Sequence, residues 1–392
     1  MINKIILFNT LYYPYILGGA EISTQILAET LLKKGFDVVV ISTGNKDEED
    51  IVNGVKVYYV HIPNIFWRYE ANSQNTLNRT LWRAIDYYNF FTAAKIEKIL
   101  LKENPDICHT NNIGGFSVSV WNSIKKLDIP LVHTIRDYYS ICATSKMLKN
   151  DQSCNRQCEE CKIYTYNKKI ISQKVDAVIG VSKFILDSHL KYEYFNDSIV
   201  KDYIYNPIEK IDKNFIKDKN KNLVFGYFGL ISSIKGVELL LRSFQKINNK
   251  NVKLLLAGQE NEPNYIEGLK EKYLDDRVDF VGFVKPEDFF KKVDVLIHPA
   301  LWNEPFGRVV AEGYAYGVPV IASEKGGLTE IVDNNKTGFL FKSEKEFIDK
   351  INYFIDNRNV IEGMKENCIE KAKTLTADNI VDQYIKVYNK VI

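Results

Sequence analysis

The sequence has few cysteines and no long apolar run. Six cysteines among 392 residues are too few for a disulfide scaffold. The apolar run at residues 5–8 is too short for a signal peptide, and no stretch approaches the ~20 apolar residues that cross a bilayer. We therefore expect a cytoplasmic protein that could touch a membrane only peripherally.

An excess of charge of one sign is also missing. Lysine and arginine number 52 and aspartate and glutamate number 50, which gives a formal net charge of +2 at pH 7. Such a balance gives no global electrostatic case for binding nucleic acid. We therefore expect no nucleic-acid partner.

What the sequence does contain is a repeated alternation of strand and helix patterns. The segment KIILFNTLYYP predicts a buried strand and a loop, and apolar residues then recur at helical spacing up to Lys34. Further strand patterns follow, with one long helix expected over residues 76–103. Near YNPIEKIDKNFIKDKNKN the apolar pattern lapses, and a second alternating series begins at residue 223.

These patterns predict an α/β protein made of two Rossmann-like, doubly wound domains. We expect an N-terminal domain at residues 1–205, a linker at 206–222 and a C-terminal domain at 223–392, whose last helix could pack back on the N-terminal domain. Ligands of such sheets bind beyond the carboxyl ends of the strands. We therefore expect the domains to face each other across a ligand-binding cleft.

The stretch WNEPFGRVVAEG carries two glutamates, Glu304 and Glu312, eight positions apart. Pro305 favours a helix start, which attracts anions such as phosphate. Glu312 would lie about 12 Å along the axis from Glu304, a span comparable to that between the sugar and the ribose of a nucleotide sugar. The two acids could hold opposite ends of such a ligand. Alternatively, Glu304 is a plain helix-start charge and Glu312 a solvated residue.

This stretch and several others resemble the retaining nucleotide-sugar glycosyltransferases of family 4, which have the GT-B fold. In chain order the similar segments are YPYILGGAE, YFGLISSIKG, LAGQ, VDFVGFV, DVLIHPALWNEPFG, GVPVIAS and DNNKTGFLF. Each segment alone is a weak signal, whereas all of them in order are a strong one. The resemblance covers nearly the whole chain.

The resemblance implies roles for individual residues. Glu304 would hold the hydroxyls of the donor sugar, and Lys235 would neutralise the leaving diphosphate. Glu312 would bind the ribose, while Arg136 and Asp137 would line the site beside these catalytic residues. The implied donor-binding residues are Gly18, Gly19, Gly229, Phe283, Val284, Phe306, Gly307, Arg308 and Glu312.

Two positions depart from the family pattern. Leu230 stands where family members often carry an arginine, so one phosphate cation is missing, and the side chain of Arg308 could replace it. Arg136 stands where relatives often have a histidine, and arginine cannot act as a general base at neutral pH. His133 is expected on the opposite face of the same strand, as a core histidine.

The reaction class follows from a missing motif and from the resemblance. No two aspartates flank a single residue, so the D-x-D metal motif of the other large glycosyltransferase fold is absent from the sequence. We therefore expect catalysis without a metal cofactor. The resemblance implies retention of the anomeric configuration, with a nucleotide-diphosphate sugar (UDP or GDP) as donor and a glycan as acceptor.

Three segments have a composition typical of a membrane surface. NIFWRYE and TLWRAIDYYNFF mix Trp, Tyr and Phe with Arg, KIYTYNKKIISQK is basic and contains tyrosine, and such mixtures suit an anionic membrane interface. By analogy with similar transferases, a protein with such aromatic segments is expected to extend a lipid-linked glycan in bacterial surface polysaccharide biosynthesis, such as lipopolysaccharide or capsule, and a soluble acceptor is the alternative. The protein would then be peripheral on the inner face of the plasma membrane, although long helices at a domain surface have a similar composition.

Four of the six cysteines form a separate group. Cys142, Cys154, Cys158 and Cys161 have the spacing C-x11-C-x3-C-x2-C in a polar region. Clustered thiolates can bind zinc tetrahedrally, so these four are candidate ligands of a structural zinc. The alternative is that they are buried free thiols.

Three other functions are open to this architecture. A nucleotide-sugar epimerase would need further acid and base residues, and a non-catalytic relative would be compatible with Leu230 and Arg136. A Rossmann oxidoreductase is disfavoured because the first glycine turn lacks G-x-G-x-x-G.

Overall fold

The computed structural model describes the chain as two compact units. The described residues are 2–149, 152–209, 211, 217–218, 221–260, 262–273 and 275–392. The first unit comprises Met1–Met147, Cys154–Pro207 and Ala377–Ile392, and the second comprises Leu148–Ser153 and Ile208–Thr376. Within the predicted linker, residues 210, 212–216, 219 and 220 lie outside the described residues.

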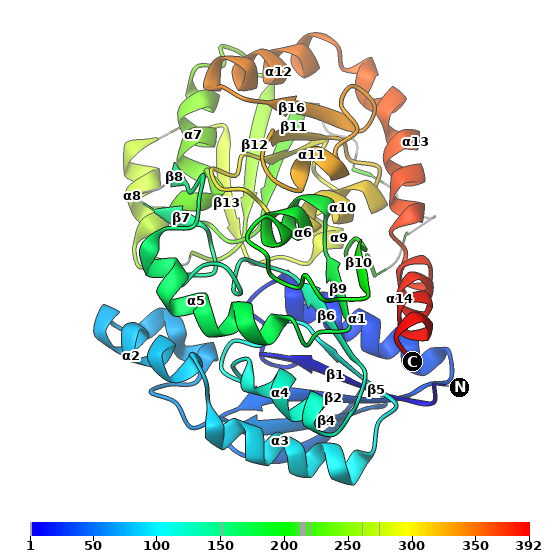
Figure 1. The fold of residues 1–392 in the computed structure, drawn as a ribbon. Coiled ribbons are helices and arrows are strands. Elements are labelled where there is room, and N and C mark those ends of the chain that lie inside the picture. The colour runs from blue at the N-terminus through cyan, green and yellow to red at the C-terminus, as the bar shows by residue number, and fades with distance from the viewer. Residues whose placement is uncertain are drawn as a thin grey trace. The chain divides into compact units, whose positions relative to one another are not determined.

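An eight-stranded sheet forms the centre of the first unit, in the order β10-β9-β6-β5-β1-β2-β4-β3 (Figure 1). Neighbouring strands are parallel except for β3 and β4. The strands are β1 (Lys4–Asn9), β2 (Asp37–Gly44), β3 (Glu48–Val52), β4 (Val55–His61), β5 (Ile107–Thr110), β6 (Leu131–Ile135), β9 (Ala177–Gly180) and β10 (Val200–Tyr203). Their nearly continuous apolar runs are typical of parallel strands covered on both faces.

The helices of the first unit differ from the sequence prediction at one place. They are α1 (Gly19–Lys33), η1 (Arg68–Ser73), α2 (Thr76–Asp86), α3 (Phe90–Glu103), α4 (Ser119–Lys126), α5 (Glu159–Ser172), α6 (Lys183–Leu190) and α14 (Ala377–Val391). The single helix expected over residues 76–103 is wrong, because the chain leaves the helix between Asp86 and Phe90. There Asn89 caps α3 by accepting a hydrogen bond from the backbone N–H of Thr92 at 3.2 Å.

Helix α14, at the end of the chain, completes the core of the first unit. It packs against α1, and Tyr384 and Tyr388 are fully buried. The hydroxyl of Tyr388 lies 2.8 Å from Nδ1 of His109, and that of Tyr384 lies 3.1 Å from Oγ1 of Thr134. The last helix is therefore bonded to strands β5 and β6.

The second unit has a six-stranded, fully parallel sheet in the order β13-β12-β11-β14-β15-β16 (Figure 1). Its strands are β11 (Leu223–Phe228), β12 (Val252–Ala257), β13 (Val278–Gly282), β14 (Val295–His298), β15 (Val320–Ser323) and β16 (Gly338–Phe341). Its helices are η2 (Ser233–Lys235), α7 (Val237–Gln245), α8 (Tyr265–Lys272), α9 (Pro286–Phe290), α10 (Arg308–Ala315), α11 (Leu328–Ile331), α12 (Glu344–Asp356) and α13 (Asn359–Thr374). A short hairpin, β7 (Leu148–Lys149) with β8 (Gln152–Ser153), is grouped with it. The predicted α/β class with two doubly wound sheets is confirmed.

The core of the second unit lies between its sheet and helices α7 and α12. Phe225, Leu240 and Phe354 are fully buried members of this cluster. Burial of this kind fixes the positions of the strand ends, because protein interiors are close-packed. The loops at those strand ends carry the site described next.

Candidate active site

The residues predicted to bind the donor collect at one edge of the second unit's sheet. Parallel strands end at the same edge, so the loops after β11, β13 and β14 lie together there. Gly229 directly follows β11, Phe283 and Val284 follow β13, and the segment with Glu304 follows β14. The side chain of Phe283 is largely exposed, so this loop is open to a ligand.

Glu304 is the centre of a polar cluster at this edge. Its Oε2 accepts hydrogen bonds from Nζ of Lys235 at 2.8 Å and from Nε1 of Trp302 at 2.9 Å. Nε2 of His298 lies 3.5 Å from the same oxygen, too far for a good hydrogen bond. Burial alone would raise the pKa of Glu304, but the charge of Lys235 and the contact with His298 outweigh it and lower the pKa to about 2. The carboxylate is therefore ionised at neutral pH.

Several polar atoms of this cluster have no hydrogen-bond partner among the described residues. All contacts of the Glu304 carboxylate are made by Oε2, which leaves Oε1 open. Both ring nitrogens of His298 are buried without a partner, and so is the hydroxyl of Ser232, three positions before Lys235. Buried polar groups of folded proteins are nearly always hydrogen-bonded, so these atoms could bind a polar ligand.

The backbone of Glu304 is held by a pair of glycines after β15. The N–H of Gly327 donates to the carbonyl oxygen of Glu304 at 2.7 Å. A Cβ on Gly326 would lie 2.3 Å from that oxygen, and a Cβ on Gly327 would lie 2.4 Å from the carbonyl oxygen of Pro305. Only glycine allows this close approach, so the two glycines fix the position of Glu304.

Helix α10 begins later than Pro305 suggests. It starts at Arg308, and Gly307 precedes it in the left-handed region with φ of 96°. Pro305 therefore does not occupy the first position of the helix, because this glycine turn separates Glu304 from α10. On α10, Nε of Arg308 donates to Oε1 of Glu312 at 2.7 Å, so the arginine side chain is engaged by this acid. The buried ring of Phe306 anchors the turn.

The glycine segment after β11 is also tightly placed. Gly229 has φ of 139°, and a Cβ on Gly258 would lie 1.8 Å from its carbonyl oxygen. The hydroxyl of Tyr227 donates to the carbonyl of Leu230 at 2.6 Å, while the Leu230 side chain is exposed. Leu230 therefore presents an apolar side chain at the position where the resemblance predicts a cation.

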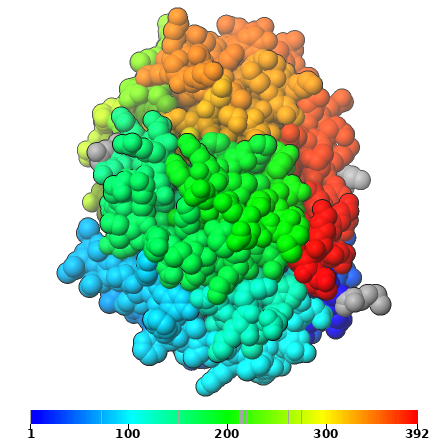
Figure 2. Space-filling model, viewed as in Figure 1, coloured from blue at the N-terminus to red at the C-terminus, as the bar shows by residue number. Residues whose placement is uncertain are grey.

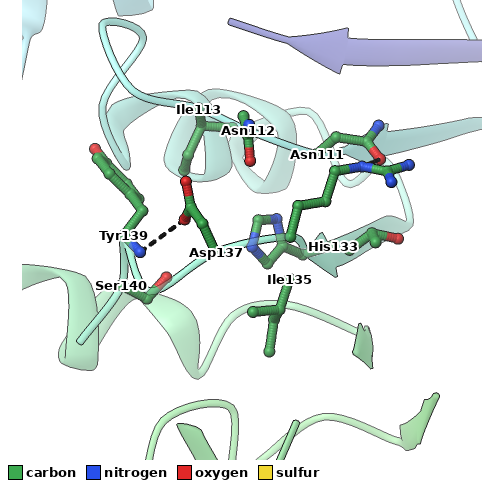
Figure 3. A pocket seen from close by; sticks show the side chains of 10 residues that line it. Asn111, Asn112, Ile113, His133, Ile135, Asp137, Tyr139 and Ser140 are labelled. Carbon is green, nitrogen blue, oxygen red and sulfur yellow. Dashed lines mark hydrogen bonds between the residues drawn. The ribbon is translucent and has the colours of Figure 1, made fainter. Parts of the chain in front are cut away.

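In the first unit, Arg136 and Asp137 line a small pocket beyond the end of β6 (Figure 3). Arg136 donates from Nε to Oδ1 of Asn111 at 2.9 Å and from Nη1 to Oδ1 of Asn206. Oδ1 of Asp137 accepts a hydrogen bond from the N–H of Tyr139 at 2.8 Å, and burial raises the pKa of this carboxyl. Both residues therefore lie at the carboxyl edge of their own sheet, as the sequence predicts for a ligand site.

His133 lines the same pocket but is a buried packing residue. Its Nδ1 lies 3.0 Å from Oγ1 of Thr110, and its ring packs edge-on against Trp121. Burial lowers its pKa to about 3, so the ring is neutral at pH 7.

The glycine loop of the first unit contains an acid that sequence reasoning missed. Gly19 begins α1, and Glu21 accepts a hydrogen bond from the N–H of Gly18 through Oε2 at 2.9 Å. Burial raises the pKa of Glu21 to about 7, although nearby backbone N–H groups and Arg136 oppose this rise. An acid at the third helical position is a capping signal that could have revealed it. A Cβ on Gly18 would meet only Glu21, at 3.7 Å, so packing does not require glycine there.

A second missed group positions the loop that carries Asp137. Asp86 accepts hydrogen bonds from the N–H of Gly115 at 2.6 Å and from the hydroxyl of Tyr139 at 2.7 Å. Nζ of Lys168 donates to the carbonyl of Tyr139 at 3.2 Å and lies 4.0 Å from Asp86. Burial raises the pKa of Asp86 to about 6 and lowers that of Lys168 to about 8. No sequence pattern links these residues, because they lie on separate elements.

The structure brings together three of the four cysteines predicted as zinc ligands. The sulfurs of Cys142 and Cys161 are 3.8 Å apart, and Cys158, which immediately precedes α5, also interacts with Cys161 through its side chain. Cys154 donates from its backbone N–H to the carbonyl of Met147 at 2.8 Å. Within the described part of the chain, no group of three or more His, Cys, Asp or Glu residues is arranged to hold a metal ion. The zinc site stays a prediction.

Similarity to known proteins identifies the family. Residues 17–209 match the family model described as Glycosyltransferase Family 4, and residues 208–375 match Glycosyl transferases group 1. An uncharacterized 42.6 kDa protein in the cps region of Klebsiella pneumoniae is 35% identical over 98% of this chain and 99% of that protein. A capsular polysaccharide biosynthesis glycosyltransferase of Staphylococcus aureus is 30% identical over 46% of this chain and 49% of that protein.

The fold agrees with that of solved structures. The Anabaena protein HepE, solved in complex with UDP and glucose, has a TM-score of 0.74 and 19% identity over 99% of this chain and 100% of that one. At that identity the similarity shows the fold alone. With both parallel sheets observed and both family models matched, the chain belongs to glycosyltransferase family 4 and has the GT-B fold.

Proposed function

We propose that this glycosyltransferase moves a hexose from UDP- or GDP-sugar to a glycan acceptor, with retention of configuration and without a catalytic metal. The observation that carries the proposal is the Glu304 cluster, where a largely buried, ionised carboxylate keeps one oxygen open beside a lysine. The donor sugar would supply hydroxyls for Oε1 of Glu304 and for the buried nitrogens of His298. Binding would thus satisfy polar atoms that the fold leaves without partners.

Lys235 supports the departure of the leaving group. Its ammonium lies 2.8 Å from Glu304 and is partly exposed, so it can approach the diphosphate next to the sugar. Negative charge grows on that diphosphate as the glycosidic bond breaks, and a fixed cation stabilises it. In the proposed reaction the acceptor oxygen bonds to the anomeric carbon on the face that the phosphate leaves. The acceptor's proton passes to that phosphate.

The rest of the donor would lie along the same sheet edge. The backbone of Phe283 and Val284 would contact the nucleobase, and Gly229 would allow the diphosphate to approach the chain. The amides of Phe306, Gly307 and Arg308 would face sugar or phosphate, and Glu312 would bind the ribose. Because Arg308 already pairs with Glu312, we propose that it orients the ribose-binding acid.

The acceptor would bind to the first unit, beside Gly18, Gly19, Arg136 and Asp137. The surroundings of Gly18 support this assignment, since a Cβ there would meet only Glu21, at 3.7 Å, and packing does not require the glycine. The Staphylococcus aureus relative acts in capsular polysaccharide biosynthesis by name, which supports a lipid-linked acceptor in bacterial surface polysaccharide assembly. The enzyme would then work in the cytoplasm, peripherally on the inner face of the plasma membrane. No described helix has the length and apolar character to cross a bilayer.

The cysteine group is proposed to have a structural role. Sulfurs of Cys142 and Cys161 accept hydrogen bonds from the N–H groups of Met147 at 3.3 Å and Ala143 at 3.5 Å, respectively. The hydrogen bond with Cys161 lowers the pKa of Cys142 to about 5, whereas the same contact and burial raise the pKa of Cys161, so Cys142 is the one favoured as a thiolate, the form that binds zinc. With Cys154 and Cys158 these two cysteines could form a structural zinc site after local rearrangement, apart from the chemistry.

The stereochemistry and metal independence can be tested in one experiment. An α-linked nucleotide sugar is expected to give an α-linked product, read from the anomeric proton by NMR, at a rate that EDTA leaves unchanged. A β-linked product would refute retention, and loss of rate that only added Mg²⁺ or Mn²⁺ restores would refute metal independence. Nucleoside diphosphate release that requires acceptor would separate transfer from epimerisation and from mere binding. The departures at Leu230 and Arg136 make this control necessary.

Glu312 gives a second test, directed at the ribose. Glu312→Gln is expected to raise the Kd for the nucleoside diphosphate about tenfold, because a charged hydrogen bond to ribose hydroxyls is weakened. Isothermal titration calorimetry measures this, with 2′-deoxynucleoside diphosphate as the matched ligand. The variant should lose most of the preference for ribose over deoxyribose. An unchanged preference would assign Glu312 to the helix alone.

A further inference from the structure

Helix α2 exposes an apolar stripe that no described part of the chain covers. Leu77, Leu81 and Ile85 are exposed and follow each other at a spacing of four residues, so they lie on one face of the helix. Trp82 and Asp86 are buried on another face, which anchors the helix to the unit. An exposed stripe of this kind on an anchored helix usually marks an interaction site.

Two neighbouring segments extend the exposed apolar surface. Phe90 and Phe91, at the start of α3, are 74% and 72% exposed. On α5, Ile163, Tyr166 and Ile170 are exposed on the face opposite the buried residues. Large apolar side chains on protein surfaces are normally scattered singly.

Contacts between α2 and α5 show that these residues share one region of the first unit. Nδ2 of Asn167 on α5 donates to the carbonyl of Tyr87, just after α2, at 3.2 Å. Lys168 reaches Asp86 from the same turn of α5. Figure 2 shows α5, in green, and the segment around α2, in light blue, next to each other on one face. We define the docking face as Leu77, Leu81, Ile85, Phe90, Phe91, Ile163, Tyr166 and Ile170.

The charges around the docking face are mostly positive. Residues 71–94 and 159–175 contain Arg79, Arg83, Lys162, Lys168, Lys169, Lys174 and three acids, Asp86, Glu159 and Glu160. Asp86 and Lys168 are both buried, so they do not affect the surface charge, and the exposed remainder is net positive. Lys162 and Lys169 pair with Glu159 and Glu193 at its margin. Apolar and aromatic side chains surrounded by basic residues suit a surface of anionic headgroups over acyl chains.

We propose that the docking face binds the surface of a bilayer that contains anionic lipid. Phe90, Phe91 and Leu77 would enter the boundary between headgroups and acyl chains, and the arginines of α2 would contact lipid phosphates. A second copy of the chain fits less well. A two-fold interface brings the same patch of both copies together, so the basic residues would face each other. The proposal rests on the lipid-linked acceptor only for its purpose, because the docking face belongs to the first unit and the Glu304 cluster to the second.

The test is vesicle co-sedimentation with the full chain. Wild-type protein is expected to bind vesicles of phosphatidylglycerol and phosphatidylcholine, more weakly at high salt, and to leave vesicles of phosphatidylcholine alone largely unbound. Phe90→Ser with Phe91→Ser is expected to lower the partition coefficient at least about tenfold, because two large apolar side chains no longer enter the interface. Ile51→Ser with Ile199→Ser is the matched control, at positions in β3 and just before β10 that are 71% and 73% exposed. It should bind as wild type does.

Three outcomes would overturn the proposal. The first is that the wild type does not bind anionic vesicles. The second is that the Phe90 and Phe91 variant binds them as tightly as the wild type. The third is that the control variant loses as much vesicle binding as the Phe90 and Phe91 variant. Light scattering after size exclusion tests the second-copy alternative, since a dimer that only the Phe90 and Phe91 variant abolishes would assign the surface to self-association. Transfer to a short water-soluble acceptor should be unchanged in this variant. If the protein transfers sugar but does not bind anionic vesicles, only the docking proposal fails. If it binds anionic vesicles but does not transfer sugar, only the proposed function fails.

Discussion

Glu304→Gln is expected to lower kcat about 10²- to 10³-fold, the range found when one group that stabilises a transition state is removed. The amide keeps the shape of the side chain but loses the negative charge that holds Lys235 at 2.8 Å. It also weakens the acceptor atom that would orient the sugar. Steady-state transfer assays over a range of donor concentrations measure the effect on kcat and KM.

The matched control for this variant is Glu344→Gln. Glu344 belongs to the same unit and also pairs with two basic residues, Arg242 and Lys246, but on the surface between α7 and α12. Glu344→Gln should leave kcat within about twofold of the wild-type value, because exposed ion pairs contribute little to the stability of the fold. If Glu304→Gln transferred sugar at the wild-type rate, the assignment of this cluster as the active site would be wrong.

Lys235→Ala is expected to lower kcat by a similar factor, about 10²-fold or more, with a smaller change in KM. The physical reason differs from that for Glu304→Gln, because Lys235→Ala removes the positive charge that would stabilise the leaving diphosphate. Lys235→Arg should recover part of the rate, because it keeps the charge with a different geometry. A donor with a better leaving group should also lose less rate in Lys235→Ala than the natural donor does.

Lys246→Ala serves as the control, since Lys246 pairs with Glu344 on the surface of the same unit. Thermal melts accompany both variants. A lower Tm for Lys235→Ala with an unchanged kcat would make Lys235 a structural residue that only neutralises buried Glu304.

The fold could be predicted from the sequence because its strands are short apolar runs covered on both faces. Ile5–Phe8 and Val295–Ile297 are buried in this way, and each is followed by a polar or glycine-containing loop. That pattern specifies parallel sheets and places ligands at the carboxyl ends of the strands. The break between α2 and α3 is not predicted from the sequence, because its signal is a single N-cap residue, Asn89. One capping residue is a weak signal when the helical spacing of apolar residues continues on both sides of it.

The sequence predicts which residues belong to the candidate site, but it does not predict how their side chains pair. Lys235 and Glu304 are 69 positions apart, and nothing local indicates that they pair through one oxygen while the other stays open. The turn at Gly307 depends on Leu328, which fills the space where a Cβ would lie. Asp86, Tyr139 and Lys168 meet only after three separate elements have packed. Such contacts depend on tertiary structure, which a pattern of spacings does not record.

Helix α14 belongs to the first unit but follows the second unit in the chain, so the first unit cannot complete its core until the second unit has been synthesised. The eight strands of that unit leave the ribosome first, yet Tyr384 and Tyr388, which contact His109 and Thr134, are made only after the second unit. Domains of most multidomain proteins fold one after another from the N-terminus as they emerge. Here the first unit has to wait with buried polar atoms and apolar surface uncovered until the second unit has been translated. Nascent chains of this protein therefore depend on protection from aggregation for longer than the length of their first unit implies.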